Sequence, residues 1–161
     1  MSTATDVNLL KGRSVQEVLN FLINEFWQGM LQHHSHVAII NALGLKKLSQ
    51  EMSERISDEP DTIRKLSDRL LDIDGVIDIN LRKCDLGSSL REILERDLNA
   101  QKAGGPIFAA AIAIAEQNKD IVTKRLIEDI AIDEEAHLLW LKNELSLLDR
   151  VGDQLYFSTR S

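Results

Sequence analysis

The sequence is poor in the residues that build several specialised protein classes. Its 161 residues include one cysteine, two prolines and eight glycines. A single cysteine cannot pair within the chain, which excludes a disulfide-rich scaffold. The low glycine and proline contents, beside 43% hydrophobic residues, exclude collagen-like and disordered chains. No apolar run reaches the roughly 18 residues that a membrane span needs, and the first residues lack the apolar core of a signal peptide.

The chain is also short of positive charge. Nineteen Lys and Arg residues against 26 Asp and Glu residues give a net charge of −7, and the basic residues are scattered along the sequence. Such a surface repels a phosphate backbone, so no nucleic-acid partner is expected. The length suits one domain. We therefore expect a single cytoplasmic domain of a reducing compartment, without nucleic-acid or membrane partners.

Apolar residues recur at helical spacing in four long segments. These segments span residues 15–40, 45–70, 90–115 and 121–148. Ser14 with Glu17 forms a capping box before the first segment, and Gly44 is a suitable helix end after it. Interior prolines break one helical hydrogen bond, so a kink or bulge is predicted at Pro60 in the second helix and at Pro106 in the third.

The irregular stretch 72–89 separates the second and third helices. A lone strand at 76–81 would have nothing to pair with, whereas about 12 extended residues at roughly 3.3 Å each span the length of a bundle. The three connections between the four helices are short, long and short in turn, which is typical of the ferritin-like fold. We therefore predict an all-α, ferritin-like four-helix bundle over 15–150 with a long crossover, a flexible leader over 1–14, and a short fifth helix within 151–161.

Polar side chains interrupt the apolar stripes near the middle of every helix. In chain order they are Glu25, Glu59, Gln101, Glu134 and His137. A buried, unpaired carboxylate costs several kcal/mol, and no Lys or Arg shares these stripes, so protons or a metal ion must compensate. Glu134 and His137 lie one turn apart, and such carboxylate and imidazole donors suit iron, manganese or zinc.

Three histidines crowd the end of the first helix: His33, His34 and His36. No acidic cluster is expected opposite them at that height of the bundle. We therefore interpret them as ordinary packing and solvated residues rather than as metal ligands.

The last helix contains the sequence DEEAHLLWLKNEL at residues 133–145, which resembles the bacterioferritins. Asn24-Glu25, the GLKKL run at 44–48 and the RDL run at 96–98 resemble the same family, across nearly the whole helical region. The resemblance implies a roughly spherical cage of 24 subunits that oxidises ferrous iron and stores ferric mineral.

The resemblance also implies metal-site roles for four residues. Glu25 matches the terminal carboxylate of the first helix, Glu59 and Glu134 match the two bridging carboxylates, and His137 matches the imidazole of the fourth helix. Asp97 lies where it could orient a ligand through a hydrogen bond.

Three positions depart from the family pattern. Gln101 stands where the family has a glutamate, and Thr62 where it has a histidine, so both would be weaker donors. Pro60 replaces the axial haem methionine, so no haem is expected at that site. Three carboxylates cannot balance two ferrous ions, so we expect an incomplete centre that holds one divalent ion, or two weakly, with impaired ferroxidase activity.

The leading hypothesis is an iron-storage cage subunit that binds iron at a degraded site, either alone or beside a catalytically complete subunit. One alternative is an active ferroxidase that uses the remaining ligands. Another is a helical interaction protein without a storage role. A DNA-protecting mini-ferritin is disfavoured, because the leader carries only Lys11 and Arg13 as basic residues.

Overall fold

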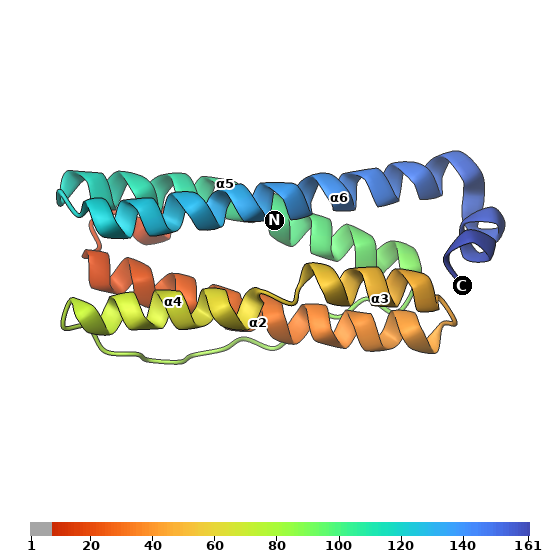
Figure 1. Cartoon of the computed structure of the whole chain (residues 1–161), viewed down its shortest axis with the longest axis horizontal. Helices are drawn as coiled ribbons and strands as arrows, with labels where there is room; N and C mark the ends of the chain where they lie inside the picture. The colour runs from red at the N-terminus through yellow and green to blue at the C-terminus, as the bar shows by residue number, and fades with distance from the viewer. Residues whose placement is uncertain (1–7) are drawn as a thin grey trace.

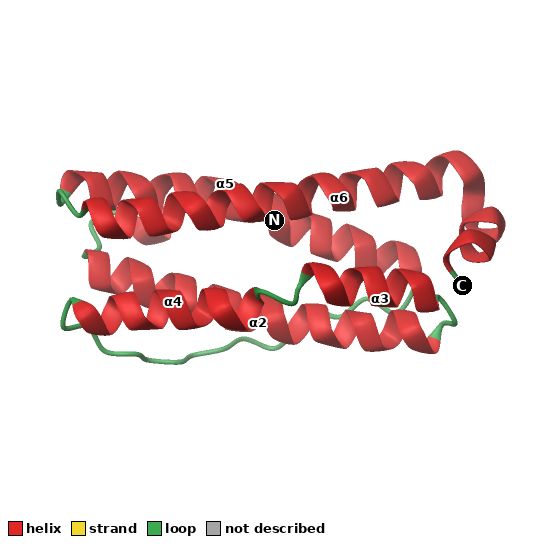
Figure 2. Cartoon of the chain, viewed as in Figure 1, coloured by secondary structure: helices red, strands yellow, loops and turns green. Residues whose placement is uncertain are grey.

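A computed structural model of the chain describes residues 8–161. Its long helices are α2 (Val15–Ala42), α3 (Lys46–Arg55), α4 (Glu59–Asp72), α5 (Leu90–Gln117) and α6 (Ile121–Arg160). Figure 1 shows them parallel to one long axis, with α5 and α6 side by side and facing α2, α3 and α4. Apart from a short helical turn at residues 8–10, the remainder of the described chain is loop and turn (Figure 2), which confirms the predicted all-α class.

The first helix begins and ends where the sequence predicts. The side chain of Ser14 accepts a hydrogen bond from the backbone N–H of Glu17, and the Glu17 carboxylate accepts one in return from the Ser14 N–H at 2.7 Å. Gly44 has a φ of +87°, a left-handed conformation that glycine adopts without strain. The chain can therefore turn back at once into α3.

The second predicted helix is in fact two helices. A turn at residues 56–58 separates α3 from α4, and Pro60 lies in the first turn of α4. Proline is tolerated there because the first N–H groups of a helix have no intrahelical partner. The predicted distortion at Pro60 is thus a complete break, whereas α5 keeps its helical backbone through Pro106 without a bulge.

The crossover between α4 and α5 runs along the outside of α2 (Figure 1). Amide side chains at every fourth position of α2 face the crossover or residues next to it. They are Gln16, Asn20, Asn24, Gln28 and Gln32. Asn20 accepts from the Asp78 N–H at 2.9 Å and donates to the Asp78 carbonyl at 3.0 Å, while Asn24 accepts from the Asn80 N–H at 2.5 Å. This amide row supplies partners for crossover backbone groups that no strand satisfies.

The apolar core is divided into two clusters. One joins the first half of α2 to α4, the end of α5 and the start of α6, and it includes Leu10, so this part of the predicted leader is buried against the bundle. The other joins the second half of α2 to α3, the start of α5 and the second half of α6. The polar side chains lie between these clusters, at mid-length of the bundle.

The part of α6 that follows Gly152 is a short helical segment that bends away from the rest of the helix. The bend is at Gly152, whose φ is +73°, and Figure 1 shows the tail turned across the end of the bundle. Tyr156 of this segment is fully buried in the second cluster. The predicted short fifth helix is therefore present. No helix of residues 8–161 is both long and apolar enough to cross a membrane.

Candidate metal centre

A cavity of about 500 Å³ opens at the middle of the bundle. Its polar lining comes from α2, α4, α5, α6 and the crossover: Glu25, Gln28, Gln32, His33, Glu59, Arg82, Gln101 and Glu134. The rest is mostly apolar, with Leu22, Phe26, Ile107 and Phe108 among the lining residues. The sequence pattern thus brings three of the four candidate ligands to one chamber.

Glu59 is buried, and only one of its two carboxylate oxygens has a hydrogen-bond partner in the described structure. It is 8% exposed, and its Oε1 accepts a hydrogen bond from Nδ1 of His33, also 8% exposed. Its Oε2 is buried and has no hydrogen-bond partner in the described structure. Burial alone would lower the pKa of His33, but the hydrogen bond to Glu59 and the charges of Glu59, Asp97 and Glu134 outweigh it and raise that pKa.

Glu134 is held by an amide. The side chain of Gln101 donates to its Oε2 at 2.8 Å. Burial raises the pKa of Glu134, because the low-dielectric interior disfavours its charged form, and Glu59 adds to this effect. The Gln101 amide therefore acts as a hydrogen-bond donor to this carboxylate.

His137 lies on the other side of His33. The two ring centroids are 5.7 Å apart, and the His137 ring stacks on Trp140 at 5.9 Å. Its Nδ1 is buried without a partner. A void of only about 10 Å³ is lined by His33, His137, Asp97 and apolar side chains. Burial lowers the pKa of His137 to about 4, so this ring is neutral near pH 7.

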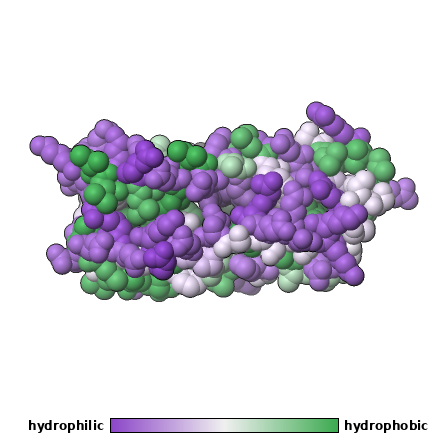
Figure 3. All heavy atoms as spheres, in the orientation of Figure 1, coloured by the Kyte–Doolittle hydropathy of each residue, from purple (hydrophilic) through white to green (hydrophobic). Residues whose placement is uncertain are grey.

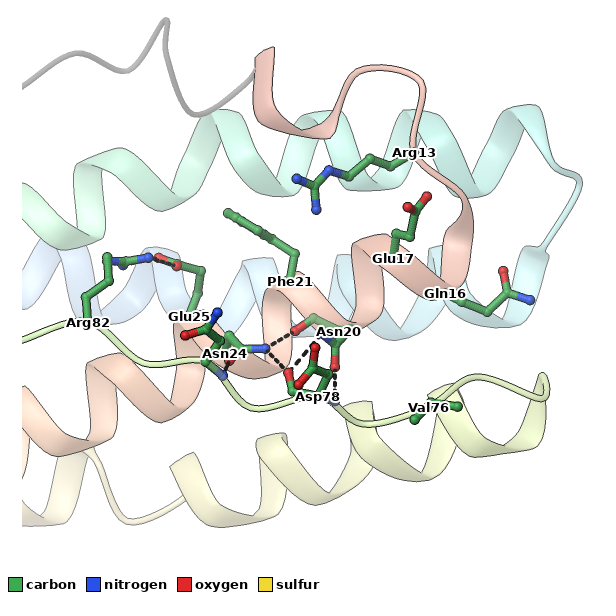
Figure 4. Close-up of a pocket in the computed structure, with 11 residues that line it drawn as sticks. Arg13, Gln16, Glu17, Asn20, Phe21, Asn24, Glu25, Val76, Asp78 and Arg82 are labelled. Carbon is green, nitrogen blue, oxygen red and sulfur yellow. Dashed lines mark hydrogen bonds and ion pairs between the residues drawn. The ribbon is translucent and has the colours of Figure 1, made fainter.

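Glu25 faces the crossover. Its two carboxylate oxygens accept from the guanidinium of Arg82 at 2.7 and 3.1 Å (Figure 4). Arg82 is itself positioned by its backbone N–H, which donates to the Gln28 side chain at 2.8 Å. A bidentate guanidinium contact is among the stronger charge-assisted hydrogen bonds. Glu25, the predicted terminal ligand, is thus already paired with the cationic side chain of Arg82.

A second histidine–carboxylate pair lies beside the cavity. Asp97, 2% exposed, accepts from Nδ1 of His36 at 2.8 Å and from the Gln32 amide at 2.9 Å. Nε2 of His36 accepts from the Gly87 N–H at 3.0 Å, which fixes the tautomer and ties the end of the crossover to the bundle. Burial would raise the pKa of Asp97, but His36, His33 and Gln32 together lower it.

Two of these histidines contradict the sequence interpretation. His33 and His36 face Glu59 and Asp97, so acidic groups do lie opposite them, and only His34 is exposed. The missed signal is spacing, because His33 lies eight residues after Glu25 on the same helix face. Thr62 is half-buried in the first turn of α4 and is not among the residues that line the cavity.

The donors in this centre are arranged as pairs rather than as a ready metal site. Among residues 8–161, no three His, Cys, Asp or Glu side chains converge as they would around an ion. Two orphaned atoms, Oε2 of Glu59 and Nδ1 of His137, remain as buried ligands without partners. Both are atom types that bind divalent transition-metal ions, but Glu59 lines the large cavity whereas His137 lines the small void.

Comparisons with known proteins agree with this architecture. The ferritin-like domain model matches residues 16–151. A bacterioferritin of Rhodobacter capsulatus is 30% identical over 143 residues, covering 87% of this chain and 88% of that protein. The chain belongs to the bacterioferritin family.

Solved bacterioferritin structures show the same fold. The Rhodobacter capsulatus structure, described with a metal-free dinuclear site and haem iron, has a TM-score of 0.88 at 27% identity and covers 91% of this chain and 92% of that one. A mycobacterial bacterioferritin has a TM-score of 0.87 at 26% identity, with 91% of each chain covered. This bacterioferritin-family chain therefore has the same helical bundle as these structures.

Proposed function

We propose that this chain is an iron-storage subunit of a cage, with a bundle centre that binds one divalent iron ion, or two weakly, and that oxidises iron slowly. The observation that carries this proposal is that each candidate carboxylate is already paired with another side chain of the protein. Glu25 is bound to Arg82, Glu59 to His33, and Glu134 to Gln101. In each pair a protein group supplies what a metal ion would otherwise supply.

Charge supports the same proposal. Two ferrous ions bring four positive charges, and the three carboxylates supply at most three negative ones. Arg82 already neutralises one of these, since its guanidinium stays protonated in proteins. A second ion would enter a centre with too few oxygen and imidazole donors, and amide oxygens hold iron less well than carboxylates.

Exposed apolar side chains support assembly with further subunits. Figure 3 shows apolar areas among polar ones on the face in view. Ile121, Val122 and Ile132 of α6 and Val76 of the crossover are 62–78% exposed. Apolar surface of this kind is typical of protein–protein contacts. The partner is a second copy of this chain, or a bacterioferritin-type subunit with a complete centre.

The deciding experiment is aerobic oxidation of ferrous iron by the purified chain, followed by the absorbance of the ferric product. We expect a rate far below that of an intact di-iron ferritin measured in parallel, and at most one tightly bound ferrous ion per subunit in anaerobic titration. A rate equal to the intact ferritin would refute the degraded centre and favour the active ferroxidase. In that case Glu134→Ala should abolish turnover.

Light scattering tests the storage role separately. A hollow shell of many subunits, alone or after mixing with a complete bacterioferritin subunit, is expected. A monomer or a dimer under both conditions would favour the helical interaction protein instead. Iron loading of the shell, measured as ions retained per particle after gel filtration, then distinguishes a storage cage from an empty one.

A further inference from the structure

His33 stands at the junction between the two groups of candidate ligands. Its ring lines the large cavity together with Glu59 and Glu134, and it also lines the small void together with His137 and Asp97. Through Nδ1 it contacts Glu59, and its centroid lies 5.7 Å from that of His137. The ring therefore lies between the carboxylate side and the imidazole side of the centre.

His33 is held in place by its burial and by its contact with Glu59. Gly29 lies beside the ring one turn earlier on α2, where a β-carbon would make ordinary van der Waals contact with Cε1 of His33, at 3.7 Å. His33 is 8% exposed and reaches Glu59 across the bundle from α2 to α4. Packing and a hydrogen bond thus hold the imidazole where it is.

We propose that His33 sets the metal capacity of this centre, by occupying the space between Glu59 and His137 and binding the Glu59 oxygen that a second ion would need. This inference rests on the proposed function and gives a cause for the low metal capacity of the centre. The losses at positions 62 and 101 remove donors, whereas His33 keeps the remaining donors apart. Restoring the two lost ligands should therefore fail to restore a two-ion centre while His33 is present.

The test uses the full chain and anaerobic titration with cobalt(II), whose visible absorption reports bound ions independently of iron turnover. The reference variant is the double substitution Thr62→His with Gln101→Glu. To it we add either His33→Ala or, as the matched control, His34→Ala, which changes the exposed neighbouring histidine. Circular dichroism and thermal melting of each metal-free protein check that the fold is kept.

We expect the double variant and its His34→Ala derivative to bind one cobalt ion tightly. The His33→Ala derivative should bind two, with the second dissociation constant tightened by about 10- to 100-fold, the usual range for residues that act on metal ligands. If His33→Ala destabilises the fold, His33→Val replaces it, because valine restores part of the packing but has neither the ring nor a donor for Glu59. The same gain of a second ion is then expected.

Two results would overturn the inference. A double variant that binds two ions tightly with His33 in place shows that the missing donors were the whole cause. Loss of all cobalt binding in the His33→Ala derivative shows that His33 is itself a ligand. Neither result touches the proposed function, which fails separately if the unaltered chain binds two ions tightly and oxidises iron at the rate of an intact ferritin.

Discussion

Two glutamates of this bundle are equally buried but differently supported. Glu144 on α6 is 5% exposed and Glu59 on α4 is 8% exposed. Oε2 of Glu144 accepts from the Tyr156 hydroxyl at 2.5 Å, and its Oε1 accepts from the Arg160 guanidinium at 2.5 Å. Glu59 has His33 on one oxygen and no partner for the other within the described structure.

The comparison separates a structural carboxylate from one that is free to bind. Glu144 joins the segment of α6 after Gly152 to the rest of that helix. Burial together with the neighbouring Glu144 raises the pKa of Tyr156, so the hydroxyl keeps the proton that it donates. Arg160 also contacts Glu51 at 3.2 Å, and Glu51 accepts from the indole N–H of Trp140 at 2.7 Å. A complete network of this kind fixes a fold, whereas an unpaired buried oxygen keeps its affinity for a ligand.

The largest stability loss is expected for Glu144→Gln. The amide still reaches Tyr156, but the charge that faces Arg160 is removed from a buried position, at a cost of about 2–3 kcal/mol. The thermal midpoint of the metal-free protein measures it. Glu135→Gln, at an exposed site on the same helix, is the matched control and should change little. Equal midpoints for both variants would contradict a structural role for Glu144.

Asp97→Asn should cost less, about 1–2 kcal/mol near pH 7, because the amide oxygen still accepts from His36. The effect should depend on pH. His36, His33 and Gln32 hold the pKa of Asp97 below its ordinary value of 3.8, so this carboxylate stabilises the fold above that value and loses its contribution as the pH falls through the folded pKa. Denaturant unfolding from pH 7 to pH 3 should show the two proteins converging in acid; a constant gap would contradict this origin.

Asn24→Ala tests the amide row with a smaller effect. It removes the bonds to the Asp78 carbonyl and the Asn80 N–H, but both backbone groups lie near the surface and can be hydrated, so about 1 kcal/mol is expected. Hydrogen exchange should increase at the Asn80 amide. Asn143→Ala, an exposed asparagine on α6, provides the control. Unchanged exchange at residue 80 would show that the crossover does not depend on this contact.

The helices could be predicted because their signals are local. Ser14 and Glu17 define the start of α2, and apolar spacing defines the faces that pack. The same reasoning joined α3 to α4, since the turn at 56–58 interrupts the backbone without interrupting the apolar pattern. Pro60 predicts an interruption at the correct position, but a proline alone does not decide whether the helix bends or ends there.

The partners in the centre could not be predicted, because each joins residues far apart in the sequence. Arg82 lies in the crossover, and nothing local indicates that it reaches Glu25. The sequence alone favours a packing role for His33, because its acidic neighbour comes from another helix. The positions of the carboxylates follow from helical period, whereas what neutralises them depends on how the helices are rotated against one another.

Glu59→Gln completes the comparison with the smallest expected loss of stability. The amide can still accept from His33, and removing a buried charge with an unpaired oxygen offsets part of the cost, so a change within about 1 kcal/mol is expected in the metal-free protein. Cobalt binding by the same variant should be strongly reduced, because the amide is a poorer ligand than the carboxylate. A midpoint drop as large as that of Glu144→Gln, with cobalt binding intact, would mean that Glu59 serves the fold rather than the metal.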